Sequence, residues 1–118
     1  MNRKTESYPY VLVRTKTGET RKVFVPRNSA DIDNQQDVPA YVLALIAFSP
    51  IVDGVVNYSS FTHSVMKQLQ RQVGDETLRR ILSELLGEIS RGFKPHNPFG
   101  LFVSRVRGTM NGGNFIQL

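Results

Sequence analysis

Four polar residues in one predicted helix have side chains suited to binding nucleic acid. His63, Lys67 and Arg71 recur at four-residue spacing, and Gln70 lies beside them. This spacing places them on one face of an α-helix, and that face has no acidic residue. Lysine and arginine pair with phosphates, and arginine and glutamine also form bidentate hydrogen bonds with base edges. The face therefore predicts a nucleic-acid contact, with a solvated basic face as the alternative.

Further candidate contacts lie toward the two ends of the chain. They are Arg14, Lys16, Arg21 and Lys22 in the N-terminal segment, and Arg105 and Arg107 in the C-terminal segment. Residues 1–27 hold seven basic and two acidic side chains. Residues 28–88 hold four basic and eight acidic side chains, and residues 89–118 hold four basic side chains and no acidic one. The net charge of +5 thus hides two basic ends around an acidic middle. If the ends meet in space, an anionic partner is expected.

The sequence contains no familiar catalytic or metal-binding pattern. It has no cysteine, which excludes disulfides, cysteine-ligated zinc, iron–sulfur clusters and thiol catalysis. Its two histidines, His63 and His96, belong to no HExxH or similar pair. A Walker loop, a GxGxxG turn and a GxSxG elbow are all missing. We therefore expect a protein that is not an enzyme and that needs no cofactor and no metal.

The N-terminal third predicts a β-hairpin and then a loop. Residues 8–14 and 21–25 are rich in β-branched and aromatic side chains, and Gly18 supplies the positive φ for the turn between them. Residues 1–27 thus form a basic hairpin segment. Residues 28–38 are mostly polar and turn-forming, which predicts a loop.

Residues 39–108 predict a helical core. The segment 40–48 is apolar on nearly every side, as is typical of a buried central helix. Capping residues and glycines delimit further helices at Ser60–Val73, Glu76–Arg91 and Pro98–Arg107. The first two of these helices are joined so tightly that we expect a helix-turn-helix-like core.

Two segments are predicted to be irregular. Residues 51–58 mix β-branched residues with a turn dipeptide and are expected to form a connector. Residues 109–118 form a tail rich in glycine and asparagine, which we expect not to be helical and which ends in Phe115–Leu118. The expected fold is α+β and mainly helical, with an N-terminal hairpin and four to five helices in one domain, residues 1–118. No stretch suits a membrane span or a signal peptide, so we expect a cytoplasmic protein without membrane contact.

Two motifs in the C-terminal third resemble those of a known class of protein. Val73–Leu82 opens a helix with glycine and an acidic residue, and Asn97–Phe102, followed by Arg105, opens another with Asn-Pro-x-Gly and then aliphatic and aromatic residues. The pattern resembles the closing helices of small helical modules in bacterial plasmid, phage and mobile-element replication proteins. The resemblance implies nucleic-acid binding in a bacterial or phage setting.

Two hypotheses follow from these observations. The first is a non-enzymatic bacterial, phage or mobile-element protein that binds nucleic acid, DNA in preference to RNA, through its basic helix and hairpin faces. The second is a protein-interaction adaptor or a subunit of a small homo-oligomer. In that case the partner would contact the edge of the hairpin or the apolar residues Phe115–Leu118.

Overall fold

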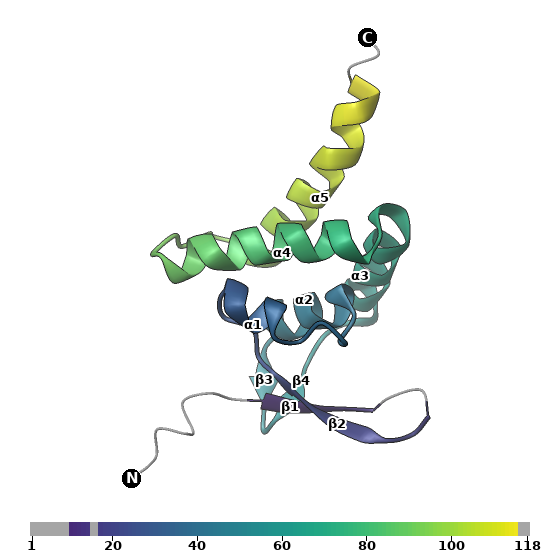
Figure 1. Cartoon of the computed structure of the whole chain (residues 1–118), viewed down its shortest axis with the longest axis vertical. Helices are drawn as coiled ribbons and strands as arrows, with labels where there is room; N and C mark the ends of the chain where they lie inside the picture. The colour runs from purple at the N-terminus through teal and green to yellow at the C-terminus, as the bar shows by residue number, and fades with distance from the viewer. Residues whose placement is uncertain (1–9, 15–16, 116–118) are drawn as a thin grey trace.

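Two small β-hairpins and five helices make up the part of the chain that this computed structural model describes, residues 10–14 and 17–115, with side chains through residue 110 (Figure 1). In chain order the elements are β1 (Tyr10–Arg14), β2 (Thr20–Phe24), α1 (Ser29–Asp33), α2 (Ala40–Phe48), β3 (Ile51–Val52), β4 (Val55–Val56), α3 (Ser60–Val73), α4 (Asp75–Ser90) and α5 (Pro98–Phe115). The expected α+β, mainly helical class is confirmed.

The N-terminal hairpin is antiparallel and packs one of its faces on the helices. Tyr10 lies opposite Phe24, and Val11 lies opposite Val23. Side chains alternate between the two faces of a strand, so this register turns both valines toward the core, where each is at most 1% exposed. Gly18 has a φ of +92°, as the sequence predicts for the turn.

Helix α4 is the centre of the helical layer. It packs against α1, α2, α3 and α5, and Figure 1 shows it crossing the molecule between α5 and the pair α1 and α2. Leu78, Leu82 and Leu85 of its apolar stripe are fully buried, as the periodicity predicts. None of the described helices combines the length and apolar composition that crossing a bilayer requires.

The α3–α4 pair is helix-turn-helix-like only in its tight corner. A single residue, Gly74, joins the two helices, with a φ of +89° that glycine adopts without steric cost. DNA-binding helix-turn-helix motifs use about three to four residues in this turn and expose the second helix. Here the second helix is α4, which lies at the centre of the helical layer and packs against four other helices. Of the two helices, α3 is therefore the one that presents a face to solvent.

Two segments predicted to be irregular contain regular structure instead. Helix α1 interrupts the expected loop because Asn28 caps it, its side-chain oxygen accepting the Asp31 N–H at 3.0 Å. Residues 51–58 contain the hairpin of β3 and β4, which turns through positive φ at Asp53 and Gly54. Both elements are very short, so neither has enough residues to show a periodic pattern.

The C-terminal helix is longer than the sequence predicts. Asn97 caps α5 as expected, and its side-chain oxygen accepts the Gly100 N–H at 3.1 Å. The expected end at Gly108 is wrong, because α5 continues through it to Phe115. A glycine ends a helix only where it takes the left-handed conformation, and the positive-φ glycines do not include Gly108. Residues 116–118 of the expected tail lie outside the described residues.

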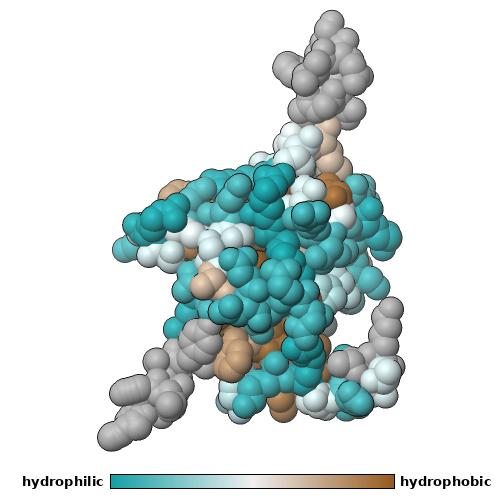
Figure 2. All heavy atoms as spheres, viewed as in Figure 1, coloured by the Kyte–Doolittle hydropathy of each residue, from teal (hydrophilic) through white to brown (hydrophobic). Residues whose placement is uncertain are grey.

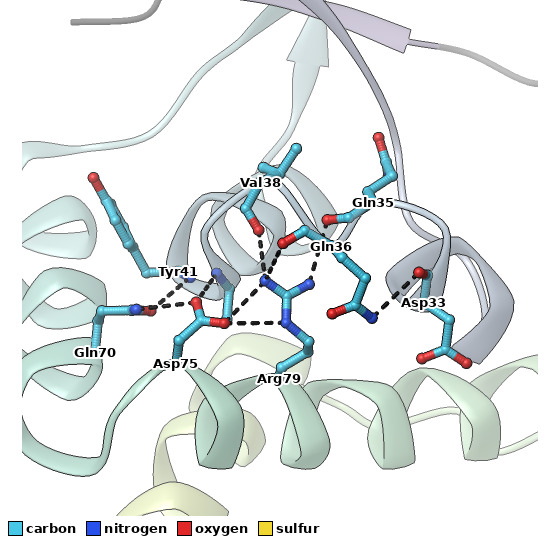
Figure 3. A network of polar contacts seen from close by, with 9 residues as sticks. Asp33, Gln35, Gln36, Val38, Tyr41, Gln70, Asp75 and Arg79 are labelled. Carbon is cyan, nitrogen blue, oxygen red and sulfur yellow. Dashed lines mark hydrogen bonds and ion pairs between the residues drawn. The ribbon is translucent and has the colours of Figure 1, made fainter.

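One carboxylate joins the ends of three helices (Figure 3). Pro39 precedes α2 and offers no side-chain cap, so the first N–H groups of that helix need partners from elsewhere. Asp75 accepts the Ala40 N–H at 2.8 Å, and Gln70 accepts the Tyr41 N–H at 3.1 Å while donating to Asp75 at 3.0 Å. The end of α3 and the start of α4 thus supply the cap that α2 lacks.

Arg79 extends this joint to the segment before α2. Its guanidinium donates two hydrogen bonds to Asp75, at 3.0 and 3.1 Å, and another to the Val38 carbonyl at 2.7 Å. Longer hydrogen bonds of 3.4 Å reach the carbonyls of Gln35 and Gln36. Arg79 is only 9% exposed, so this charge depends on its partners. Burial raises the pKa of Asp75, but the hydrogen bonds from Ala40, Gln70 and Arg79 outweigh it and hold that pKa below its ordinary value.

Asp75→Asn should destabilise the fold by about 1–3 kcal/mol at pH 7, because it leaves the buried Arg79 charge without its anionic partner. The matched change Glu84→Gln, on the same helix, breaks only an exposed 3.7 Å pair with Arg80 and should cost about 0.5 kcal/mol or less. A lowered carboxyl pKa contributes stability above the unfolded-state pKa and loses it as the pH falls through the folded-state pKa. Urea unfolding at pH 7 and pH 3 should therefore show a smaller Asp75→Asn effect in acid. Equal effects of the two substitutions at pH 7 would contradict this account.

Candidate functional site

The solvent-facing side of α3 carries cations and amides without an acid. Its exposed residues are Ser60, Phe61, Ser64, Lys67, Gln68, Arg71 and Gln72. Val65, Met66 and Leu69, on the opposite side, are buried in the core and fix which way the helix faces. We refer to Ser64, Lys67, Gln68 and Arg71 as the α3 face.

The charges of the α3 face are available to a ligand. No hydrogen bond or ion pair joins the side chains of Lys67, Gln68 or Arg71 to another residue in the part of the chain that the structure describes. Lys67 and Arg71 are separated by one helical turn, about 6 Å along the axis. Two adjacent cations of this kind attract phosphate groups, and the serine and glutamine beside them can donate and accept hydrogen bonds.

Gln70 does not belong to this exposed face, although the sequence suggests that it does. Its side chain is half-buried and is used by Tyr41 and Asp75 at the end of α2. Gln68 is the exposed glutamine instead, and it was not among the predicted contacts. The signal for it was its spacing, because Gln68 lies four residues after Ser64 and three before Arg71 and is therefore their direct neighbour on a helix.

His63 lies at the border of the exposed side, between two tyrosines. Its ring centroid is 6.2 Å from that of Tyr41 and 5.4 Å from that of Tyr58, and the residue is half-buried. The structure thus places His63 beside Lys67 and Arg71 on α3, but turned toward α2. It is a flanking residue of the α3 face.

Two depressions flank the N-terminal half of α3. One, of about 760 Å³, has His63 and Arg14 in its lining, and the other, of about 580 Å³, is lined by Val65 and Arg107 among others. A cation from the N-terminal hairpin and one from the C-terminal helix therefore lie on opposite sides of α3. The two basic ends of the chain both approach this helix.

The other hairpin cations are partly engaged with neighbours. Arg21 donates to Asp37 at 2.6 Å, and this hydrogen bond holds the pKa of Asp37 below its ordinary value. The two opposite charges of the pair offset each other. Lys22 lies 4.4 Å from the centre of the Tyr10 ring, in a cation–π contact, and stays exposed. Lys16 lies outside the described residues.

The two arginines of α5 differ in whether a carboxylate binds them. Arg105 donates two hydrogen bonds of 2.9 Å to the carboxylate of Glu88, and they hold the pKa of Glu88 below its ordinary value. This pair joins α5 to α4 and neutralises the Arg105 charge. Arg107 is exposed and borders the smaller depression, so it is the α5 cation open to a ligand.

Among residues 10–14 and 17–115, no three histidine, aspartate or glutamate side chains gather where they could hold a metal ion. What the described residues do assemble is an exposed helix face with two unpartnered cations and one further cation on each side of it. Such an arrangement can bind an extended anion.

Comparisons with known proteins add no relative. No family model matches the chain, and neither a curated protein nor a solved structure matches it.

Proposed function

We propose that this protein binds double-stranded nucleic acid, DNA in preference to RNA, through the α3 face. The observation that carries the proposal is that Lys67 and Arg71 are exposed, unpartnered among the described residues and free of acidic neighbours on their helix face. Elsewhere four of the arginines are bound to carboxylates, namely Arg21, Arg79, Arg80 and Arg105.

The flanking cations support a phosphate-contacting role. A duplex carries a phosphate row on each side of its groove, so a helix in the groove needs cations beside it as well as on it. Arg14 and Arg107 border the depressions on the two sides of α3 and have this placement. In the proposed complex α3 enters the groove, and Arg14 and Arg107 bind backbone phosphates beside it, as Lys67 and Arg71 do from the helix itself.

The shape of the site favours DNA over RNA. The major groove of B-form DNA is about 12 Å wide and admits an α-helix, whereas the deep, narrow major groove of A-form RNA excludes it. The α3 face lies on a single convex helix and needs such a wide groove. A role in bacterial, phage or mobile-element replication rests on the sequence resemblance and belongs to this proposal. A cytoplasmic location belongs to it as well and rests on the sequence pattern, which suits neither a membrane span nor a signal peptide.

Replacing Lys67 and Arg71 together by alanine should weaken binding to duplex DNA by about tenfold or more, because two charged contacts are lost. The slope of log affinity against log salt should fall by about 2, one for each phosphate contact removed. Fluorescence anisotropy with a labelled duplex between low and physiological salt measures both quantities. Both residues are exposed, so the variant should fold normally.

A matched control removes two positive charges at the end of α4 that is far from the α3–α4 corner. Arg91 and Lys94 are both exposed and follow that helix, about 24 Å along its axis from the α3 corner (Figure 1). The Arg91→Ala and Lys94→Ala double variant should bind DNA nearly as the unmodified protein does. Equal losses in the two double variants would show that the affinity reflects net charge alone and would refute the proposed site.

The two arginines of α5 provide a second test. Arg107→Ala should lower the salt slope by about 1, because this residue is free to contact a phosphate. Arg105→Ala should change the slope less, since the Arg105 charge is already held by Glu88. Circular dichroism checks that both variants stay folded, and a larger effect at Arg105 than at Arg107 would contradict the assignment of phosphate contacts.

A further inference from the structure

Phe61 is the most exposed large apolar side chain among the residues that the structure describes, with an exposed fraction of 71%. Most of the others lie in or beside the two hairpins, and Figure 2 shows hydrophobic residues gathered in that lower part of the molecule. The surface over α3, at the right of the same view, is mostly hydrophilic. Phe61 is thus an apolar side chain beside a polar face, in the first turn of the helix that carries this face.

The helical spacing places Phe61 in line with polar residues of the α3 face. At about 100° per residue, Phe61, Ser64 and Gln68 fall within about 60° of one another around the helix, and we call these three residues the α3 strip. Lys67 lies about 60° beyond Ser64 on one side of the strip. On its other side is the smaller depression, between α3 and α5, whose lining includes Phe61 and Arg107. The strip therefore has cations on both of its sides.

This order of side chains suits a helix that lies in a groove of DNA. Cations on the two sides of the α3 strip can reach the phosphates of both strands, and the strip then faces the base edges between them. In helix-turn-helix proteins the N-terminal residues of the groove-binding helix contact the bases. Phe61 is the second residue of α3 and has this position.

The chemistry of the α3 strip matches an A·T base pair better than a G·C pair. In the major groove, thymine presents a C5 methyl group to apolar side chains such as phenylalanine, and adenine presents an N6 donor and an N7 acceptor that glutamine binds together. Guanine is most often bound by arginine or lysine, which the strip lacks. Phe61 and Gln68 are about 10 Å apart along the helix axis, or about three base-pair steps, so they meet different base pairs.

We propose that the α3 strip selects A·T base pairs in the major groove of duplex DNA, with Phe61 on a thymine methyl group and Gln68 on the N6 and N7 edge of an adenine. This base preference rests on the proposed function and deepens it, because it names the base pairs that the helix contacts. The methyl contact also gives Phe61 a role, since it covers an apolar side chain that is otherwise exposed to water.

The test compares long alternating duplexes that differ only in a methyl group, so that no target sequence has to be known. Alternating A·T DNA carries a thymine methyl group at every base pair, and the same duplex with deoxyuridine in place of thymidine lacks it. Competition measured by fluorescence anisotropy with the full chain should show binding to the uracil duplex weakened about threefold or more, as the loss of one covered methyl group predicts. Phe61→Ala should weaken binding to the thymine duplex and abolish the difference between the two duplexes.

Phe93→Ala is the matched control for Phe61→Ala. Phe93 is also exposed, but it follows the end of α4 that is far from the α3–α4 corner, so this variant should keep the preference for thymine. Gln68→Ala tests the adenine contact. It should lower the preference for alternating A·T over alternating G·C DNA about fivefold or more and leave the thymine–uracil difference in place. All three positions are exposed, so the variants should fold, which circular dichroism checks.

The outcomes separate this base preference from the proposed function. Equal affinity for the thymine and uracil duplexes, or the same thymine preference in the Phe61 and Phe93 variants, would overturn the methyl contact even if the Lys67 and Arg71 double variant still binds DNA weakly. An unchanged A·T preference in Gln68→Ala would overturn the adenine contact. An absence of binding to every duplex at low salt would overturn the base preference and the proposed function together.

Discussion

The carboxylate of Asp75 is the constraint on which the arrangement of the helices depends. Helix α2 is almost wholly apolar and follows a proline, so nothing within it can satisfy its first N–H groups. Asp75 and Gln70 bring that cap from the α3–α4 corner, and Arg79 binds the carbonyls of the segment before α2. The cap uses Gln70, and this contact adds to the burial of Val65, Met66 and Leu69, which turns Lys67 and Arg71 toward solvent.

Net charge alone describes this protein poorly, because its cations are divided into two groups. Arg21, Arg79 and Arg105 are held by carboxylates and act in the fold, where they connect loop to hairpin, α4 to α2, and α5 to α4. Lys67, Arg71 and Arg107 are exposed and unpartnered among the described residues. The surface available to an anion is therefore smaller than the sequence implies, and it includes α3 as well as Arg91 and Lys94 at the far end of α4.

Local sequence was enough to predict these features: composition and a turn glycine predicted the hairpin, and helical spacing predicted the buried stripe of α4 and the exposure of Lys67 and Arg71. It could not separate Gln70 from Gln68. The partners of Gln70 are the Tyr41 N–H and Asp75, and the first of these lies 29 residues away in the sequence. Composition also misled at Gly108, because a glycine ends a helix only when it adopts a left-handed conformation, which the residue type permits but does not require.

We propose that nucleic acid binds at the α3 face and not at every basic surface of the protein. Titration of the ¹⁵N-labelled chain with a short DNA duplex tests it most directly, because amide shifts report where the ligand lies. The account predicts that the largest shifts fall on Ser64, Lys67, Gln68 and Arg71, with smaller ones at Arg14 and Arg107. Shifts concentrated at Arg91 and Lys94, or no shifts at low salt, would contradict it.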